Sequence, residues 1–165
     1  MSDQIKWDDG KIWTMIEAGD VAGLRRHWAE KVMKCLTELF ASLGRLDAVI
    51  RESEFEIGKP MAADIAAASH VIAEVDVLIA ESEDVSYNAF VRVVSHNFKV
   101  MFENIAILTR LARDAGKPSV VKATEEVCRN VSDVANADCF RSWLNGCIES
   151  IRCGDESGSD RPTVA

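Results

Sequence analysis

The chain has 165 residues, 48% of them hydrophobic, which is enough for one hydrophobic core and too few residues for two ordinary domains. Its 19 basic and 27 acidic residues give a formal net charge of −8, which disfavours nucleic acid and anionic membranes as partners. No apolar stretch is long enough to span a bilayer and no leader-like segment opens the chain, so the sequence predicts a cytoplasmic protein.

Glycine and proline mark the predicted helix boundaries. Glycine takes the left-handed conformation that ends many helices, and proline suits the first turn of a new one. Gly58-Lys59-Pro60 and Gly116-Lys117-Pro118 fit this pattern, and Asp20 directly after Gly19 fits a helix N-cap. In chain order, the predicted helices cover about residues 11–18, 20–57, 60–81, 86–115, 118–135 and a final stretch after 138.

The last twelve residues differ in composition from the rest of the chain. From Gly154 onward the sequence is rich in glycine, serine, acidic residues and proline, which bury too little apolar surface to offset the entropy lost on ordering. We therefore expect residues 1–153 to form a single helical-bundle domain and residues 154–165 to form a disordered C-terminal tail.

Apolar residues recur every three or four positions in the longer helices, as in a buried seam. The second predicted helix has this seam at Val32, Leu36, Leu39, Leu43, Leu46 and Ile50. The third has it at Met61, Ile65, Ala68, Ile72, Val75 and Ile79. The fourth is expected to be the most buried helix, because it has the longest seam, at Tyr87, Val91, Val94, Phe98, Met101, Ile105, Leu108 and Ala112. Phe90, Val93, Phe102, Ile107 and Leu111 widen this seam. Because short connections favour antiparallel neighbours, the predicted fold class is all-α, an up-down antiparallel bundle of four to six helices.

The sequence predicts no metal site and no bound cofactor. None of the three histidines follows an acidic residue by three positions, as bundle metal sites require. The seams place His27, His70 and His96 opposite the core, on a solvated face. Glycine-rich phosphate loops and a GxSxG nucleophile motif are missing from the sequence. Trp13 and Trp28 occupy apolar helix positions, which favours core packing over a cofactor box.

Cysteine usage points to free thiols. The five cysteines are an odd number without a CxxC pair, which predicts neither a disulfide framework nor a zinc ribbon. Cys35 and Cys147 fall on apolar stripes, where a thiol acts as a small hydrophobe, and Cys153 is expected to be exposed.

One stripe of the fourth predicted helix combines an imidazole with cations. Arg92, His96, Lys99 and Glu103 follow one another at spacings of four, three and four, so they share one helix face. An exposed imidazole nitrogen can form a covalent intermediate, and neighbouring cations offset the charge of a phosphoryl group. The pattern therefore makes His96 a candidate phosphoryl acceptor.

Residues 90–114, FVRVVSHNFKVMFENIAILTRLARD, resemble the histidine-bearing helix of two-component signalling proteins. The resemblance extends to the dimerisation helix of sensor kinases and to the histidine-containing phosphotransfer domain. It implies that His96 carries the phosphoryl group and that Lys99 and Arg92 contact the phosphate or an acidic pocket of the partner. The segment departs from these families at Asn97, where kinases carry an acidic residue, and at Met101, where they carry proline.

These features lead to two main hypotheses. The first is a histidine phosphotransfer-like signalling protein that accepts or relays a phosphoryl group, or a degenerate relative that binds a response regulator. No ATP-binding domain accompanies the bundle, so the chain is expected to be at most a phosphoryl carrier and not an autokinase. The alternative is a non-catalytic adaptor whose seams serve another helical protein or a second copy in a homodimer. A small enzyme or ligand-binding bundle is a third hypothesis.

Overall fold

A computed structural model describes residues 9–81 and 87–153, so the predicted tail at 154–165 lies outside the described residues. The described chain is helical and contains no strand, which confirms the all-α fold class. The helices are α1 (Asp9–Glu17), α2 (Val21–Glu52), the 3-10 turn η1 (Glu56–Gly58), α3 (Lys59–Glu81), α4 (Tyr87–Asp114) and α5 (Pro118–Arg152).

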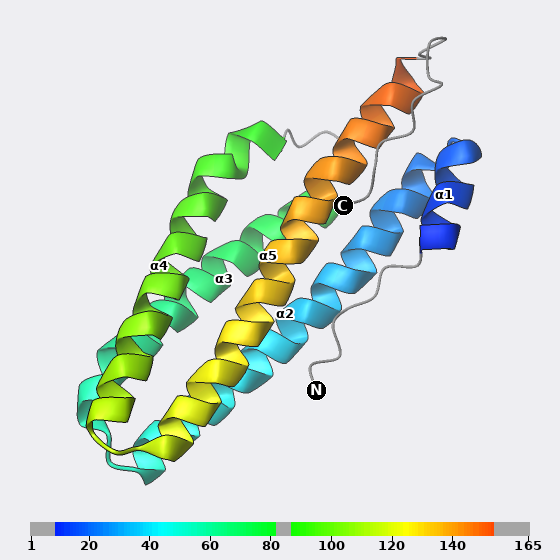
Figure 1. The fold of residues 1–165 in the computed structure, drawn as a ribbon. Coiled ribbons are helices and arrows are strands. Elements are labelled where there is room, and N and C mark those ends of the chain that lie inside the picture. The colour runs from blue at the N-terminus through cyan, green and yellow to red at the C-terminus, as the bar shows by residue number, and fades with distance from the viewer. Residues whose placement is uncertain (1–8, 82–86, 154–165) are drawn as a thin grey trace.

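Helices α2 to α5 form an up-down bundle in which each long helix runs antiparallel to the next (Figure 1). Helix α2 packs against α5 and α3, and α4 packs against α3 and α5. The short helix α1 folds back on the start of α2 and touches α5. The predicted antiparallel arrangement is therefore confirmed.

The predicted seams form the core of this bundle. All six seam positions of α2 are buried, and α3 buries the middle four of its six, Ile65, Ala68, Ile72 and Val75. Each fully buried Leu or Ile side chain contributes about 1.5–3 kcal/mol relative to exposure. In residues 9–81 and 87–153, none of the helices has an apolar stretch long enough to cross a membrane.

The start of α2 follows the predicted capping chemistry. Gly19 ends α1 in the left-handed region with φ of +68°. The Asp20 Oδ1 accepts a hydrogen bond of 2.9 Å from the backbone N–H of Gly23, so Asp20 is the N-cap of α2. This bond satisfies one of the backbone donors that the first helical turn leaves open.

Helix α2 ends at Glu52, five residues before the predicted end near Ile57. The chain reverses at Glu54, a non-glycine residue with φ of 54°. The N–H of Phe55 then donates to the carbonyl of Ile50 at 2.9 Å, as in a Schellman C-cap. The reversal carries the Phe55 ring into the core, where it is 4% exposed. Burial of this ring explains why the helix stops early.

Gly58 is needed because a side chain would not fit, and not because its backbone is left-handed, as the sequence predicted. Its φ lies outside the left-handed region, where Gly19 and Gly116 are found. A Cβ added at Gly58 would approach the Phe55 ring to 2.6 Å and a methyl group of Leu108 to 3.0 Å. The glycine therefore allows η1 to pack closely over the core.

Replacing Glu54 with glycine should stabilise the protein by about 0.5–1 kcal/mol, because glycine adopts a positive φ without the steric penalty of a Cβ. The free energy of unfolding from urea denaturation measures the change. Glu30→Gly, at an exposed position inside α2, is the matched control and should destabilise by about 1 kcal/mol. Equal destabilisation by both substitutions would contradict the assigned role of Glu54.

Helix α5 is continuous, so the predicted break between about residues 135 and 138 is wrong. Asp138, after which a separate last helix was predicted, is buried inside α5, and its carboxylate bonds to Arg141. The indole N–H of Trp28 donates to the carbonyl of Ala137 at 2.9 Å and holds α2 against this stretch. The stretch predicted as a helix break is therefore a continuous part of α5 that packs against α2.

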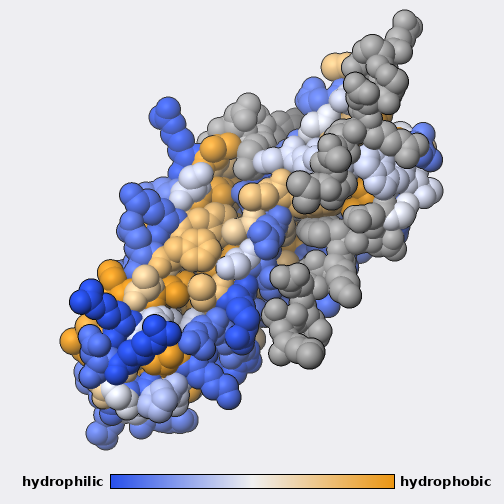
Figure 2. Space-filling view, viewed as in Figure 1, coloured by the Kyte–Doolittle hydropathy of each residue, from blue (hydrophilic) through white to orange (hydrophobic). Residues whose placement is uncertain are grey.

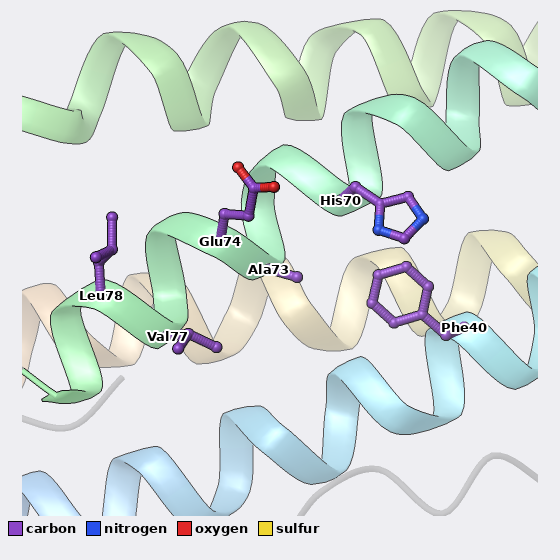
Figure 3. Close-up of a pocket in the computed structure, with 6 residues that line it drawn as sticks. All are labelled: Phe40, His70, Ala73, Glu74, Val77 and Leu78. Atoms are coloured by element: carbon purple, nitrogen blue, oxygen red, sulfur yellow. The ribbon is translucent and has the colours of Figure 1, made fainter.

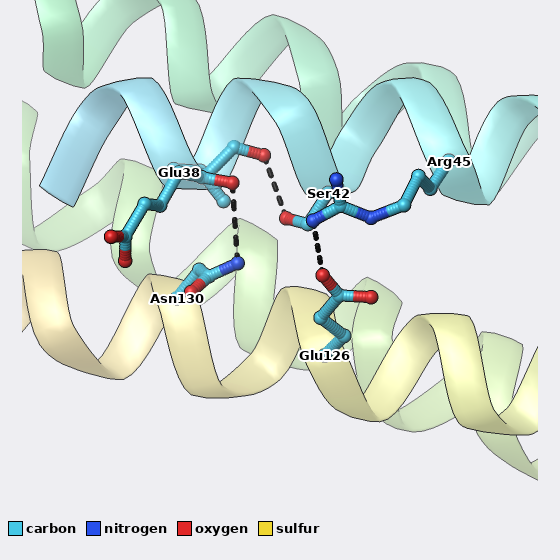
Figure 4. A network of polar contacts seen from close by, with 6 residues as sticks. Glu38, Ser42, Arg45, Glu126 and Asn130 are labelled. Atoms are coloured by element: carbon cyan, nitrogen blue, oxygen red, sulfur yellow. Dashed lines mark hydrogen bonds and ion pairs between the residues drawn. The ribbon is translucent and has the colours of Figure 1, made fainter. Parts of the chain in front are cut away.

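Polar contacts also fix the register of α2 against α5 (Figure 4). Arg45 pairs with Glu126, and the side-chain amide of Asn130 donates to the backbone carbonyl of Glu38 at 3.3 Å. Exposed ion pairs of this kind add little stability, so their effect lies in alignment.

Helix α4 is not the most buried helix, contrary to the prediction. Five positions of its seam are buried, Val94, Met101, Ile105, Leu108 and Ala112, while Val91 and Phe98 are half-buried. Val93, Phe102 and Ile107, which widen the apolar seam in the sequence, are 41%, 38% and 49% exposed. Helix α4 packs against the long helices α3 and α5, and an apolar arc wider than these two contacts extends into solvent.

Candidate functional site

The predicted stripe on α4 faces outward. His96, Arg92 and Lys99 are all exposed, as predicted from the seam. The Lys99 Nζ lies 3.8 Å from the Glu103 Oε1, and these two side chains are 72% and 60% exposed. Such a solvated ion pair is weak, so the ammonium group remains available for another anion.

The two cations are placed by the helix one turn before and one turn after the imidazole. Arg92 precedes His96 by four residues and Lys99 follows it by three, which are the spacings of side-chain neighbours on a helix surface. A ring in this position is reachable from solvent and has a positive charge one turn away on either side. The roles of these three residues in phosphoryl chemistry stay predictions.

Residues beside His96 make its surroundings partly apolar. The Asn97 Nδ2 donates to the backbone carbonyl of Val93 at 2.8 Å, so this amide is held on its own helix. The exposed side chain of Val93 lies one turn before Asn97, and that of Phe102 follows further along α4. A partner that approaches His96 therefore meets both cations and apolar surface.

A groove of about 530 Å³ continues along the boundary of α4 and α5. Its lining includes the apolar residues Phe102 and Ala106, the basic residues Arg110 and Arg113, and Cys128 of α5. Figure 2 shows apolar surface on this side of the molecule, bordered by hydrophilic residues. The face of α4 thus combines basic and apolar side chains well beyond His96.

A second groove of about 570 Å³ lies between α2 and α3 (Figure 3). The His70 ring faces the Phe40 ring with centroids 4.8 Å apart, and Val77 and Leu78 extend the apolar lining. His70 is exposed, as predicted, but its closest partner is an aromatic ring. In contrast to His96, it has an acidic neighbour, Glu74, one turn away in the same groove.

His27 is buried at 7% exposure, so its predicted place on the solvated face is wrong. Helix α2 packs against α1 as well as α5, and the neighbouring Trp28 contacts Ala137 and Arg141 of α5. Trp28 is buried in the core, as predicted, and Trp13 packs edge-on against Trp143 with ring centroids 5.9 Å apart.

The five thiols are free, and two of them are buried as predicted. Burial, helped by Asp133 and Glu38, raises the pKa of the Cys35 thiol to about 12, and burial also raises the pKa of Cys147. Both stay protonated at neutral pH, which disfavours a nucleophilic role. Cys153 is exposed, as predicted.

The structure brings together a buried charged cluster that the sequence prediction missed. Asp76 of α3 is 1% exposed, and Arg141 and Asp138 of α5 are 2% and 7% exposed. Arg141 hydrogen-bonds to Asp138, its Nη1 lies 3.6 Å from the Asp76 Oδ1, and its guanidinium lies 5.1 Å from the centroid of the Trp28 ring. Three helices therefore contribute to one polar layer inside the bundle.

Burial raises the pKa of Asp76 to about 7, against the opposing effect of Arg141 and with a further increase from Asp138. Two sequence signals point to this cluster. Asp76 directly follows the seam residue Val75, and Arg141 follows Asp138 by three positions, which is ion-pair spacing on a helix.

No group of three or more His, Cys, Asp or Glu side chains in the described part of the chain is arranged to hold a metal ion. Comparison with protein-family models, curated proteins and solved structures gave no match to this chain.

Proposed function

We propose that this protein is a histidine phosphotransfer-like signalling protein in which His96 accepts a phosphoryl group from a receiver domain and passes it on. The observation that carries the proposal is the exposure of His96 between Arg92 and Lys99 on the outer face of α4. The antiparallel bundle supports it, because the resemblance around His96 implies a histidine on a helix of such a bundle.

The proposed reaction moves a phosphoryl group from a partner's aspartyl phosphate to His96. The unprotonated ring nitrogen attacks the phosphorus, and an N–P bond forms. The P–O bond to the partner's carboxylate breaks, and its electron pair remains on that carboxylate. The proton on the other ring nitrogen passes to solvent. Return of the group to a second receiver reverses these steps.

Arg92 and Lys99 offset the negative charge that the phosphoryl group brings to the helix. Phosphoryl transfer depends mainly on positioning and on electrostatic stabilisation of the equatorial oxygens. The charge-assisted contact of Lys99 with a phosphate would replace its loose pair with Glu103, whose two charged atoms are 3.8 Å apart.

The partner proposed for this face is an acidic protein surface. The chain as a whole carries a charge of −8, yet Arg110 and Arg113 line the α4–α5 groove together with Asp114. Arg113 is in a loose, exposed ion pair with Glu125, 3.6 Å away. A receiver domain, whose phosphorylation site is acidic, complements these charges. The exposed side chains of Phe102 and Ile107 add apolar contact area.

The second candidate function is a degenerate relative or adaptor that binds its partner without phosphorylation. The observation that favours it is the exposure of Val93, Phe102 and Ile107, because bulky apolar side chains near His96 hinder close approach but suit a stable interface. The same face serves both candidates, and only the fate of the phosphoryl group separates them.

Incubation of the full chain with a panel of receiver domains carrying radioactive aspartyl phosphate tests the proposal. Label should appear on the wild-type chain, disappear in His96→Ala and persist in His70→Ala, which removes the other exposed histidine. Label that persists in His96→Ala would contradict the assignment. Binding measured by calorimetry in the absence of any label would support the adaptor instead.

A further inference from the structure

The buried layer around Asp76 holds two acidic side chains and one basic one. Arg141 and Asp138 lie on α5, and Asp76 faces them from α3. With both carboxyls ionised, the charges of Asp76, Asp138 and Arg141 sum to −1. A net charge in the interior of a bundle is strongly disfavoured.

Asp76 is the acidic side chain of this layer whose charge no hydrogen bond from the described part of the chain stabilises. The guanidinium of Arg141 hydrogen-bonds to Asp138 and lies over the Trp28 ring. Its Nη1 is 3.6 Å from the Asp76 Oδ1, which is beyond hydrogen-bond distance. Neither oxygen of Asp76 accepts a hydrogen bond from the described residues. An ionised Asp76 would therefore be buried with a single, loose electrostatic partner.

We infer that Asp76 is a proton-binding site: the folded bundle takes up one proton at this carboxyl and releases it on unfolding. Protonation converts the layer into a neutral acid beside the Asp138–Arg141 ion pair, so the buried charges balance. The inference does not depend on the proposed phosphotransfer function, because the site lies in the core and His96 lies on the surface.

The charged groups that face Asp76 among the described residues come from one helix. The groups that act on it electrostatically are Arg141 and Asp138 of α5. Helix α2 contributes the uncharged Trp28 to the layer, and the residue before it, His27, is a buried titratable group in the same part of α2.

The position of α4 at this layer follows from one contact. The Ser69 hydroxyl lies 3.2 Å from the Met101 sulfur, so the antiparallel register of α3 and α4 places the buried, uncharged Val94 level with Asp76. Burial keeps the pKa of Asp76 near 7 in the folded state, compared with 3.8 when exposed.

The sign of the pH effect follows from these two values. Between pH 3.8 and about 7, the folded state holds the proton and the unfolded state does not, so stability falls as the pH rises and levels off above pH 7. Asp76→Asn removes this dependence. We expect the folding equilibrium constant of the wild type, relative to Asp76→Asn, to fall about a hundredfold between pH 5 and pH 8.

Urea denaturation of the full chain across this pH range measures the ratio, and calorimetric unfolding at pH 6 in buffers of different ionisation enthalpy counts protons. The wild type should release about one proton more on unfolding than Asp76→Asn. Asp64→Asn, an exposed position on the same helix, is the matched control and should behave as the wild type. The variant His27→Gln removes the imidazole of His27 and so shows how many of the released protons come from it.

A ratio independent of pH, together with equal proton release from the wild type and Asp76→Asn, would overturn the inference. A pH dependence that disappears in His27→Gln and persists in Asp76→Asn would also overturn it and assign the proton to His27. If Asp76→Asn does not fold, the number of protons released on unfolding is compared between the wild type and His27→Gln. The inference requires that His27→Gln still releases the proton, and loss of the release in this variant would overturn it.

Discussion

Replacing Arg141 with methionine should lower the free energy of unfolding by about 3–5 kcal/mol at pH 8, because it leaves two buried carboxyls without their cation. Methionine fills a similar volume, so the loss reflects charge more than packing. The contact of the guanidinium with the Trp28 ring, at 5.1 Å from the centroid, is lost as well. Urea denaturation at pH 8 measures the effect.

Two comparisons isolate the electrostatic origin of this loss. Adding Asp76→Asn to Arg141→Met should restore part of the stability, because one of the two uncompensated charges is removed. The loss should also be smaller at pH 5.5, where Asp76 is protonated in the folded state. Arg129→Met, at an exposed position of α5, should change stability by about 0.5 kcal/mol or less. A loss at Arg141 no larger than at Arg129 would refute the cluster's role.

Reversing both cations beside His96, with Arg92→Glu and Lys99→Glu together, should slow phosphoryl transfer about a hundredfold. Each charge-assisted contact with phosphate contributes about 1.5 kcal/mol, and the sum of two corresponds to that factor in rate. Rates of label transfer from a phosphorylated receiver domain measure the change. This prediction rests on the proposed function.

The matched control reverses two exposed cations on another helix, with Lys122→Glu and Arg129→Glu on α5. It changes the net charge of the chain equally, so it accounts for weaker long-range attraction to an acidic partner. Equal slowing in both double variants would show that net charge, and not contact with the phosphate near His96, controls the rate. Unchanged helicity by circular dichroism in both variants verifies folding.

Periodicity made the core of the bundle predictable. The seam from Val32 to Ile50 is buried throughout, since a three-four repeat keeps one face of a helix directed at its neighbours. The same reasoning placed His96 on the outside correctly, because it lies opposite the buried seam of α4.

Positions that depend on tertiary partners were not predictable from local sequence. His27 is buried at the start of α2, where α2 packs against α1 as well as against the other long helices, and a helix repeat gives no information about such an extra neighbour. Helix α2 ends before the predicted position because the chain reverses at Glu54 and buries Phe55, and glutamate rarely marks a helix end. A last helix was predicted to start after Asp138, but Asp138 lies inside a continuous α5, where it pairs with Arg141.

The buried cluster shows a further limit of single-sequence reasoning. Asp76 lies beside a seam residue of α3, and its significance depends on Arg141, which is 65 residues away in the sequence and on a helix that is diagonal in the bundle. Charge pairing across such a distance is visible only once the helices are packed. The spacing of Asp138 and Arg141 within α5 is compatible with an ion pair, but the sequence prediction did not use it, and it gives no information about the contact with α3.

Treatment of the purified full chain with phosphoramidate, followed by mass spectrometry that locates phosphohistidine, reads the modification of each imidazole separately. Both His70 and His96 are exposed, but only His96 has a cation one turn away on either side. His96 should be modified at least about ten times faster than His70. This ratio corresponds to about 1.4 kcal/mol of electrostatic stabilisation of the transition state by the two cations. Equal rates at the two histidines, or no phosphate on His96, would contradict its role as the phosphoryl acceptor.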